Sequence, residues 1–373
     1  MNRLKARIAL QQEQDQTGQE SFWQDLCQRL HDRQVIPIIS NAVRCDQIFD
    51  IDGDQILGIS AKDNAQPMGQ TIEEQLADAW AEKIGYPLSA NKLLARVAQF
   101  NRVKSRDDLE AKRRYLHFLK DSLLFLAEAD KGLKPGIIKE LRKGIGQQGL
   151  ADITKELEYP KFTTDDFDSL RTLAQFNLKI YVTTSYFDFM ERAIRDAGRE
   201  PRTQICFWNG EPMEFVQDGH RVDPDFVPSP KEPLVYHLFG LEAYPESLVL
   251  SEDDYLDFLT KIAQDTSQKK RVIPLYLREA LTQSSLLLLG YRLQDWDFRA
   301  LFRGIIINTP PNKRKFSLAI QVDPAQQDRI VEPQQAKEYL EKYFEASNFS
   351  VKWGNTDSFV QAMWQAWEAW RRG

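Results

Sequence analysis

Short apolar runs alternate with amphipathic stretches along most of the chain. The runs are dense in β-branched, aromatic and leucine side chains, which is typical of buried strands. They cover residues 34–40, 178–184, 205–208, 234–238, 285–290, 316–322 and 349–353. Several are followed by apolar residues at every third or fourth position, as at 187–197 and 252–264, and this spacing predicts helices. Strands that alternate with helices predict an α/β fold, with a mostly parallel sheet and helices on both faces.

The first predicted strand, at residues 34–40, contains a proline. Pro37 has no backbone N–H, and prolines in sheets are mostly confined to edge strands and strand ends. We therefore expect this strand to lie at an edge, or Pro37 to lie at the end of the strand.

Between the first and second predicted strands the pattern is helical almost throughout, from about residue 60 to 170. Apolar positions recur there with helical spacing over many turns, which predicts an all-α insertion. The predicted organisation follows from this change of pattern. It comprises a frayed N-terminal segment at 1–20, a sheet domain built from 21–54 and 171–373, and an inserted helical subdomain at 55–170.

Composition narrows the classes of function. The formal net charge of −6 gives no basic field for nucleic acid, so we expect no direct nucleic-acid partner. Cys27, Cys45 and Cys206 are too far apart in sequence for a CxxC pair, which argues against a disulfide framework and against a cysteine zinc site. We expect no metal. The polar N-terminus and the absence of an apolar run of roughly 20 residues predict a cytoplasmic protein that does not enter a membrane.

Polar residues follow two of the predicted strands. Thr183, Thr184 and Ser185 come after the strand at 178–184, where an open α/β sheet binds ligands. Thr184 or Ser185 alternatively caps the helix that follows, because serine and threonine are favoured there. After the first strand comes a loop that begins Ser40-Asn41-Ala42, where a nucleotide-binding fold places its phosphate cradle.

Three separated stretches together resemble the sirtuin-like domains of bacterial antiviral effectors. They are T-T-S-Y-F-D-F-M-E at 183–191, Y-H-L-F-G at 236–240 with S-L-V-L-S-E-D-D-Y at 247–255, and L-G-Y-R-L-Q-D-W-D-F-R at 289–299. The resemblance covers roughly residues 22–322. It implies a Rossmann-like sheet that binds NAD, with a helical subdomain over the site. Many members of the family hydrolyse NAD to nicotinamide and ADP-ribose.

The resemblance also implies a set of cofactor-binding positions. They are Ser40, Asn41, Ala42, Thr183, Thr184, Gly240, Gly290, Tyr291 and Arg292. The last three follow the most apolar strand, where the family places backbone against the cofactor ribose. Arg292 would pair with a phosphate; the alternative is an exposed arginine after a strand.

The motifs depart from the family at each element of its site. The stretch that corresponds to the family's Gly-Ala-Gly turn is Ser40-Asn41-Ala42-Val43, so both glycines are gone. The family's asparagine and aspartate are replaced by Ser185 and Phe187, and its histidine base by Phe239, which cannot exchange a proton. These replacements favour a degenerate member of the family.

A rearranged site is the alternative, with Ser185, Asp188 and His237 as its catalytic candidates. His237 lies two residues before Phe239, so on a strand we expect both side chains on the same face, about 6.6 Å apart. His237 would then reach the crevice as a base. Otherwise it is a half-buried strand histidine with a backbone partner. Protein deacetylation is disfavoured, because deacylating sirtuins usually carry a four-cysteine zinc module that this chain cannot build.

Three tryptophans recur at every third position near the C-terminus: Trp364, Trp367 and Trp370. A helical row of this kind is either a core face or a surface that docks a partner, since aromatic residues are enriched in interfaces. The predicted partner is a second copy of the chain or a second defence protein.

Two classes of function remain. One is a weak or inactive sirtuin-like protein of bacterial antiviral defence, acting as a nucleotide-binding or assembly and sensing subunit, and the departures in the motifs favour it. The other is an active NAD hydrolase that uses the rearranged site. Whether the chain is an enzyme is therefore left open by the sequence. A plain dehydrogenase is disfavoured, because no G-x-G-x-x-G follows the first predicted strand, where a dinucleotide-binding fold carries it.

Overall fold

The structure is a computed structural model whose central element is a seven-stranded sheet. It describes residues 20–43, 47–49, 55–58, 72–88, 93–128, 130, 132–159, 167–210, 216, 218–264, 272–291, 296–301, 317–321, 332–345, 349–354 and 356–373. The strands of this sheet are β1 (Val35–Ile39), β4 (Ile180–Thr183), β5 (Arg202–Ile205), β6 (Leu234–His237), β7 (Ser285–Leu289), β8 (Ser317–Gln321) and β9 (Phe349–Trp353). They lie in the order β5-β6-β4-β1-β7-β8-β9, and every neighbouring pair is parallel. The predicted α/β fold of Rossmann-like type is confirmed.

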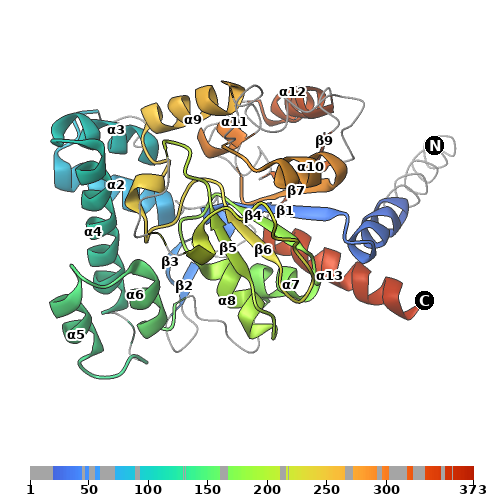
Figure 1. Ribbon diagram of the computed structural model, residues 1–373, viewed down its shortest axis with the longest axis horizontal. Helices are drawn as coiled ribbons and strands as arrows, with labels where there is room; N and C mark the ends of the chain where they lie inside the picture. Colours follow the sequence, from blue (N-terminus) through green and yellow to red (C-terminus); the bar gives the residue numbers. More distant parts are fainter. Residues whose placement is uncertain are drawn as a thin grey trace, which may run out of the picture.

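Helices cover both faces of the sheet, as predicted (Figure 1). On one side lie α9 (Glu252–Gln264), α10 (Leu275–Gln283), α11 (Trp296–Leu301) and α12 (Pro333–Glu345). On the other lie α7 (Ser169–Gln175), α8 (Phe189–Asp196), α13 (Thr356–Arg372) and a helix over residues 20–31. Each face buries its own apolar cluster, with Phe258 and Leu288 in the first and Ile194 and Leu289 in the second. Because both faces are buried, the strands are nearly continuous apolar runs.

The prediction for Pro37 was wrong, because β1 lies in the middle of the sheet. Backbone bonds from Ser40 N to Leu289 O and from Thr184 N to Ile39 O show that even-numbered residues of β1 face β7 and odd-numbered ones face β4. The missing donor of Pro37 therefore falls on the β4 side. There the pairing begins only at Ile38, one residue further along, so no ladder bond is lost.

One predicted strand was displaced along the chain. We expected residues 205–208, but β5 is Arg202–Ile205. Apolar content misled the prediction, because the polar side chains of β5 are buried with partners: Thr203 donates to Glu191 and Gln204 accepts from Tyr276. Among the described strands β5 pairs with β6 alone, so it needs neither the length nor the apolarity of a central strand.

The segment between β1 and β4 contains an antiparallel hairpin and a group of helices. These elements are β2 (Gln47–Phe49), β3 (Gln55–Gly58), α2 (Ile72–Ile84), α3 (Leu94–Lys104), α4 (Asp108–Ala127), α5 (Ile137–Gly144) and α6 (Leu150–Glu156). Trp80 of α2 and Tyr115 of α4 belong to the same apolar cluster as Ile194 of α8, so the helices and the sheet share one core. The domain boundaries at 55 and 170 stay a prediction. Residues 1–19, in the segment predicted to fray, lie outside the described part.

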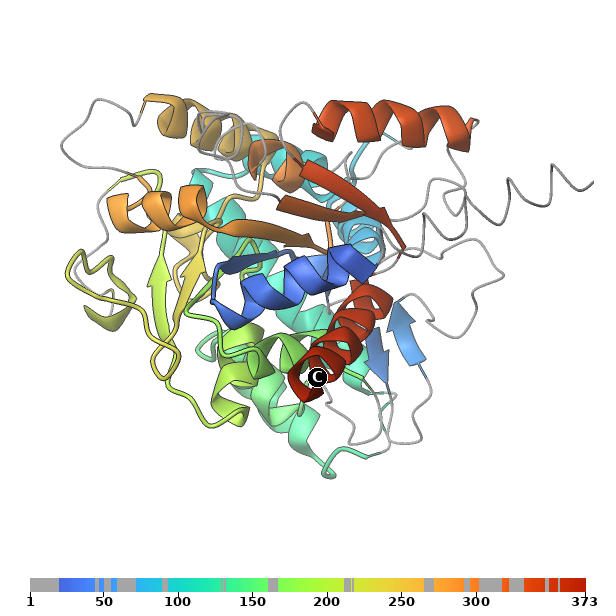
Figure 2. The same cartoon turned by 90° about the vertical axis from the view of Figure 1, so that its right-hand side faces the viewer.

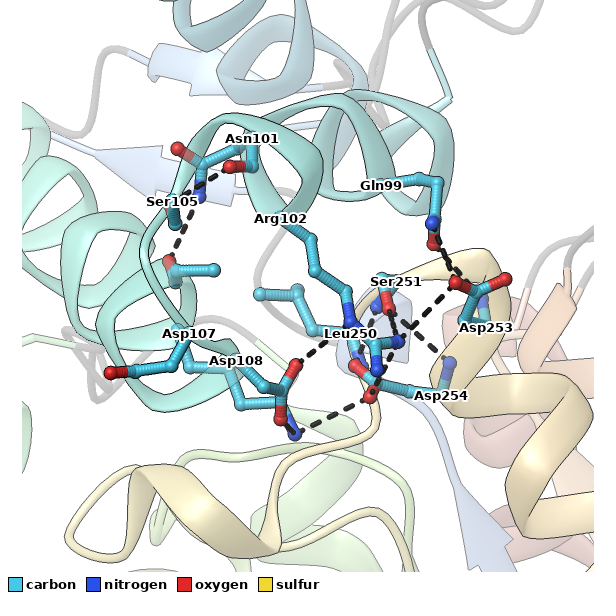
Figure 3. A network of polar contacts seen from close by, with 12 residues as sticks. Gln99, Asn101, Arg102, Ser105, Asp107, Asp108, Leu250, Ser251, Asp253 and Asp254 are labelled. Carbon is cyan, nitrogen blue, oxygen red and sulfur yellow. Dashed lines mark hydrogen bonds and ion pairs between the residues drawn. The ribbon is translucent and has the colours of Figure 1, made fainter.

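A buried ionic network fixes these helices to α9 (Figure 3). The Lys112 ammonium lies 2.8 Å from Asp108 and 3.4 Å from Asp254, and the side chains of Lys112 and Asp254 are each only 2% exposed. Arg102 of α3 lies 3.7 Å from the same Asp254 carboxylate. The other oxygen of Asp254 accepts the N–H groups of Leu250 and Ser251 at the start of α9. Acidic side chains at a helix N-terminus are favourable for the helix dipole, and here two cations, Lys112 and Arg102, share Asp254.

The tryptophan row lies on α13, facing its own chain. Trp367 is buried, and both Trp364 and Trp367 contact Phe176 edge to face next to α7. Trp370 stacks on Trp367 and contacts His31 at the end of the helix over residues 20–31, which lies beside α13 in Figure 2. This placement supports the core interpretation, and docking of a partner on this helix stays a prediction.

Two properties of the described residues bear on broad function. None of their helices combines the length and the apolarity that crossing a bilayer requires. Among the same residues, no three or more histidine, cysteine or carboxylate side chains come together in a group fit to ligate a metal. Cys27 and Cys206 are both buried, and neither forms a disulfide within the described residues. Burial raises the pKa of the Cys27 thiol to about 11.

Candidate crevice at the carboxyl ends of the strands

The chain order of the strands places a crevice at the end of β1. From β1 the chain continues to β4 on one side, and later it returns to β7 on the other side. Ligands of open α/β sheets bind at the carboxyl ends of the strands where such a reversal occurs. Six of the predicted binding residues meet there: Ser40, Asn41, Thr183, Thr184, Gly290 and Tyr291. Arg292 lies outside the described residues, as does the side chain of Ala42.

The loop after β1 is tied to both neighbouring strands. Ser40 donates through its hydroxyl to Gly290 O at 2.6 Å, which joins it to the end of β7. A short 3-10 helix, η1 (Asn41–Val43), follows. Its first side chain turns to the β4 loop, because Asn41 Oδ1 accepts the hydroxyl of Ser185 at 2.7 Å. In place of an open glycine turn, the chain has a loop whose polar groups bond to the protein itself.

Gly290 is required by the packing at this point. Its φ is +77°, and a Cβ there would lie 2.6 Å from Ser40 Oγ and 2.7 Å from Val43 Cγ2. The space that glycine leaves is therefore filled by the β1 loop and is not an opening toward a ligand. Gly240 lies elsewhere, with φ +87°, packed against the backbone of Ser247 in η3 (Pro245–Ser247).

The two threonines after β4 hold the loops together. Thr183 donates to Ile39 O at 3.0 Å and accepts from Ser185 N at 2.9 Å. Thr184 shares a hydrogen bond of 2.9 Å with the hydroxyl of Tyr291. The capping interpretation was wrong, because α8 begins at Phe189 and its N-cap is residue 188, which makes no side-chain cap bond.

His237 lies beneath the crevice and does not open into it. It is the last residue of β6 and is 0% exposed. Its Nδ1 lies 2.9 Å from Ser185 O, and its Nε2 lies 2.7 Å from Glu191 Oε1. Both ring nitrogens therefore have partners within the protein.

The expectation that His237 and Phe239 share a face was wrong. His237 points to Glu191 on α8, whereas Phe239 packs on the opposite cluster, edge to face with Tyr255 and Phe258 of α9. β6 ends at His237 and the chain then turns through Gly240, so the alternation of strand side chains does not extend to position 239.

The ionisable groups around His237 shift one another's pKa values. Burial alone would lower the pKa of His237, but the charge and hydrogen bond of Glu191, together with Ser185 O and the Asp188 charge, outweigh burial and the pKa is raised. Burial would raise the pKa of Glu191, and the His237 charge and hydrogen bond hold it below its ordinary value. Burial and the nearby Glu191 charge raise the pKa of Asp188. Asp188 Oδ1 is buried and has no hydrogen-bond partner among the described residues.

A small hollow opens between the loops. It is lined by Ile39, Ser40, Asn41, Val43, Leu170, Thr183, Ser185, Phe187, Phe189 and Met190, and leaves room for about one water molecule. Phe187 and Phe189 stack there with ring centres 4.5 Å apart. Sites that enclose a drug-sized ligand usually measure about 300–1,000 Å³. The described residues therefore do not form a pocket of that size.

Two residues of this region were not predicted as site residues. Glu191 and Thr203 complete the contacts of His237, since Thr203 donates to Glu191 Oε1 at 2.9 Å. A signal for Glu191 was present in the sequence, because it lies three positions before Ile194 on the apolar face of a predicted helix. A carboxylate on such a face is seldom buried without a partner. Thr203 gave no comparable signal.

Comparison with known proteins agrees with this architecture. Residues 179–348 match the family model of the SIR2-like domain. A comparison with curated proteins finds no similar sequence. The matched segment runs from the start of β4 to just before β9 and contains His237, Gly290 and most of the crevice. The chain therefore contains a sirtuin-like domain.

Proposed function

We propose that this protein is a weak or inactive sirtuin-like member of bacterial antiviral defence, acting in the cytoplasm as a nucleotide-binding or assembly and sensing subunit. The SIR2-like match supports the NAD-related part of the proposal. The resemblance of its motifs to those of antiviral effectors supports the defence role. A second copy of the chain or a second defence protein is the proposed partner.

One observation carries the proposal: the groups that would perform chemistry are bonded to the protein. Ser185 donates to Asn41 and accepts from Phe187 N, while the His237 ring is bonded on both sides. A general base must reach the proton that it removes, and a fully buried ring engaged at both nitrogens does not. Binding of a nucleotide moiety requires no such group, and the carboxyl ends of β1, β4 and β7 are where open α/β sheets bind their ligands.

A second candidate, an active NAD hydrolase, is favoured by one residue. Asp188 carries a buried oxygen without a described partner, and its pKa is raised by burial and by Glu191. Carboxyl groups with raised pKa values are common at catalytic sites. In this version Asp188 accepts a proton directly from a bound group, and Ser185 and His237 support the loop beside it.

Incubation with NAD separates the two candidates. For a weak or inactive member we expect no release of nicotinamide above the buffer control, together with a rise in melting temperature with AMP, ADP-ribose or NAD. Release that is abolished by Asp188→Asn, but kept by Asp196→Asn on the exposed end of the same helix, would establish the hydrolase instead. If the protein releases no nicotinamide and its melting temperature does not rise with any of the three nucleotides, both nucleotide functions are rejected. Expression in a bacterial host challenged with phage tests the defence role.

A further inference from the structure

The contacts of His237 fix where its protons are. Ser185 O is a backbone carbonyl and only accepts, so Nδ1 must donate to it. Glu191 Oε1 already accepts the hydroxyl of Thr203. The simplest assignment that satisfies all three contacts has Nε2 donating to an ionised Glu191, which makes the ring an imidazolium. The pKa directions agree, with His237 raised and Glu191 lowered.

The same ring holds the turn that follows β4. Ser185 is bonded at its N–H to Thr183 Oγ1, at its hydroxyl to Asn41 and Phe187 N, and at its carbonyl to His237. The first three bonds join neutral groups within the crevice loops. The fourth comes from beneath and is charge-assisted, so it is the strongest single restraint on the position of this residue.

We propose that Glu191 and His237 are positioning residues, a buried carboxylate–imidazolium pair that holds the carbonyl of Ser185 and so sets the shape of the crevice. Glu191 comes from α8 and His237 from β6, so the pair also fixes α8 to the sheet directly below the turn. The inference rests on the proposed function only in taking the crevice as the binding site.

Other charged groups lie around the pair and act on it. Asp188 on the β4–α8 loop stabilises the imidazolium, while Arg192 and Arg195 of α8 lower the pKa of Asp188. His220 in η2 (Asp218–His220) interacts with both His237 and Glu191, and Arg202 of β5 acts on His220. Burial lowers the pKa of His220, which therefore adds little positive charge to the group near neutral pH.

The test measures protonation and local opening without any ligand. The protein is labelled with ¹⁵N-histidine, and the His237 signal is identified by its loss in His237→Gln, with His117→Gln at an exposed position as the control. We expect both nitrogens of His237 to carry protons at pH 7, above the ordinary histidine pKa of about 6.5. In Glu191→Gln we expect the ring to become neutral. A neutral ring at pH 7 in the wild-type protein would overturn the proposal.

Hydrogen exchange tests the positioning role. In Glu191→Gln and His237→Gln, the amides of Ser185 and Phe187 should exchange roughly tenfold faster or more, beyond any change in the core strands. Leu281→Ala in α10, a core variant on the opposite face, should destabilise the protein without this local effect. Equal changes at all amides would show a merely structural role and reject the inference. If His237→Gln does not fold, the proposal is tested by hydrogen exchange in Glu191→Gln and by the protonation of the His237 ring in the wild-type protein. These measurements use no nucleotide, so they can reject the role of the buried pair without bearing on the proposed function, which the NAD assays test.

Discussion

The hydroxyl of Ser185 donates a hydrogen bond of 2.7 Å to the side-chain oxygen of Asn41, across 144 positions of the sequence. This bond joins the loop after β1 to the loop after β4 at the centre of the crevice. The site is thereby closed by its own polar groups, and a ligand that needs either of them must first break the bond.

Removing that hydroxyl should destabilise the protein. Ser185→Ala loses the bond to Asn41 and leaves Phe187 N without its acceptor, so we expect a loss of about 1–2 kcal/mol in the free energy of unfolding. Urea titration measures it. Ser122→Ala is the control, because that hydroxyl bonds only within its own helix, to Phe118 O, and should change stability by less than about 0.5 kcal/mol. Equal effects of the two variants would contradict the role given to the crevice bond.

Gly290→Ala should be strongly destabilising. The added methyl would meet Ser40 Oγ at 2.6 Å and Val43 at 2.7 Å, in addition to the cost of a φ of +77°. Gly198→Ala isolates that backbone cost, because Gly198 has φ +76° and nothing within 4 Å of its missing Cβ. We expect about 1–2 kcal/mol for Gly198→Ala and at least about twice that for Gly290→Ala, measured by thermal or urea unfolding. If Gly290→Ala loses no more unfolding free energy than Gly198→Ala, the loop after β1 moves to accommodate the methyl group at little cost.

The buried pair should give stability a defined pH dependence. The raised pKa of His237 means that its contribution is full below about pH 6.5 and is lost as pH rises through the folded-state pKa. The lowered pKa of Glu191 means that its contribution is full above about pH 4.5 and is lost as pH falls through the folded-state pKa. The difference in unfolding free energy between wild type and His237→Gln should therefore be largest between about pH 4.5 and 6.5. A difference that stays constant from pH 4 to 9 would refute this linkage.

The ionic network between α4 and α9 should depend on Lys112. Lys112→Met removes a cation from between Asp108 and Asp254, so we expect a loss of about 3 kcal/mol, the usual cost of breaking a buried ion pair from one side. Arg114→Met is the control on the same helix, since its pair with Glu110 is exposed and should contribute less than about 1 kcal/mol. Urea unfolding of the two variants side by side measures the difference, and similar losses would mean that Asp254 is satisfied by Arg102 and backbone groups.

Strand and helix patterns predicted most of the architecture, because parallel strands buried on both faces are apolar almost throughout. The pattern failed at β5, whose polar Thr203 and Gln204 are buried with partners from α8 and α10. It also failed at Pro37, since hydropathy does not show which neighbour a missing N–H faces. Both errors concern partners from distant parts of the chain.

For the crevice, the sequence predicted which residues meet and not what they do. Ser40, Thr183, Thr184 and Gly290 were expected around a cofactor, and they lie together at the strand ends. Ser40 is bonded there to Gly290, Thr183 to Ile39 and Thr184 to Tyr291. His237 was expected on the face of Phe239, and the end of β6 put the two on opposite faces. The direction of a side chain beyond the last residue of a strand is set by the turn, which strand periodicity does not describe.

The position of β1 in the sheet has a consequence for biosynthesis. Ser40 and Gly290 touch but are 250 positions apart, and Thr183 and Ile39 are 144 apart. At synthesis rates of about 5–20 residues per second, the central strand waits on the order of 10–50 s for its second neighbour. Through that time β1 is a hydrophobic strand with at least one open edge, the kind of surface that invites wrong pairing. The central strand of the finished sheet therefore keeps an unpaired edge for most of the time that the chain is being made.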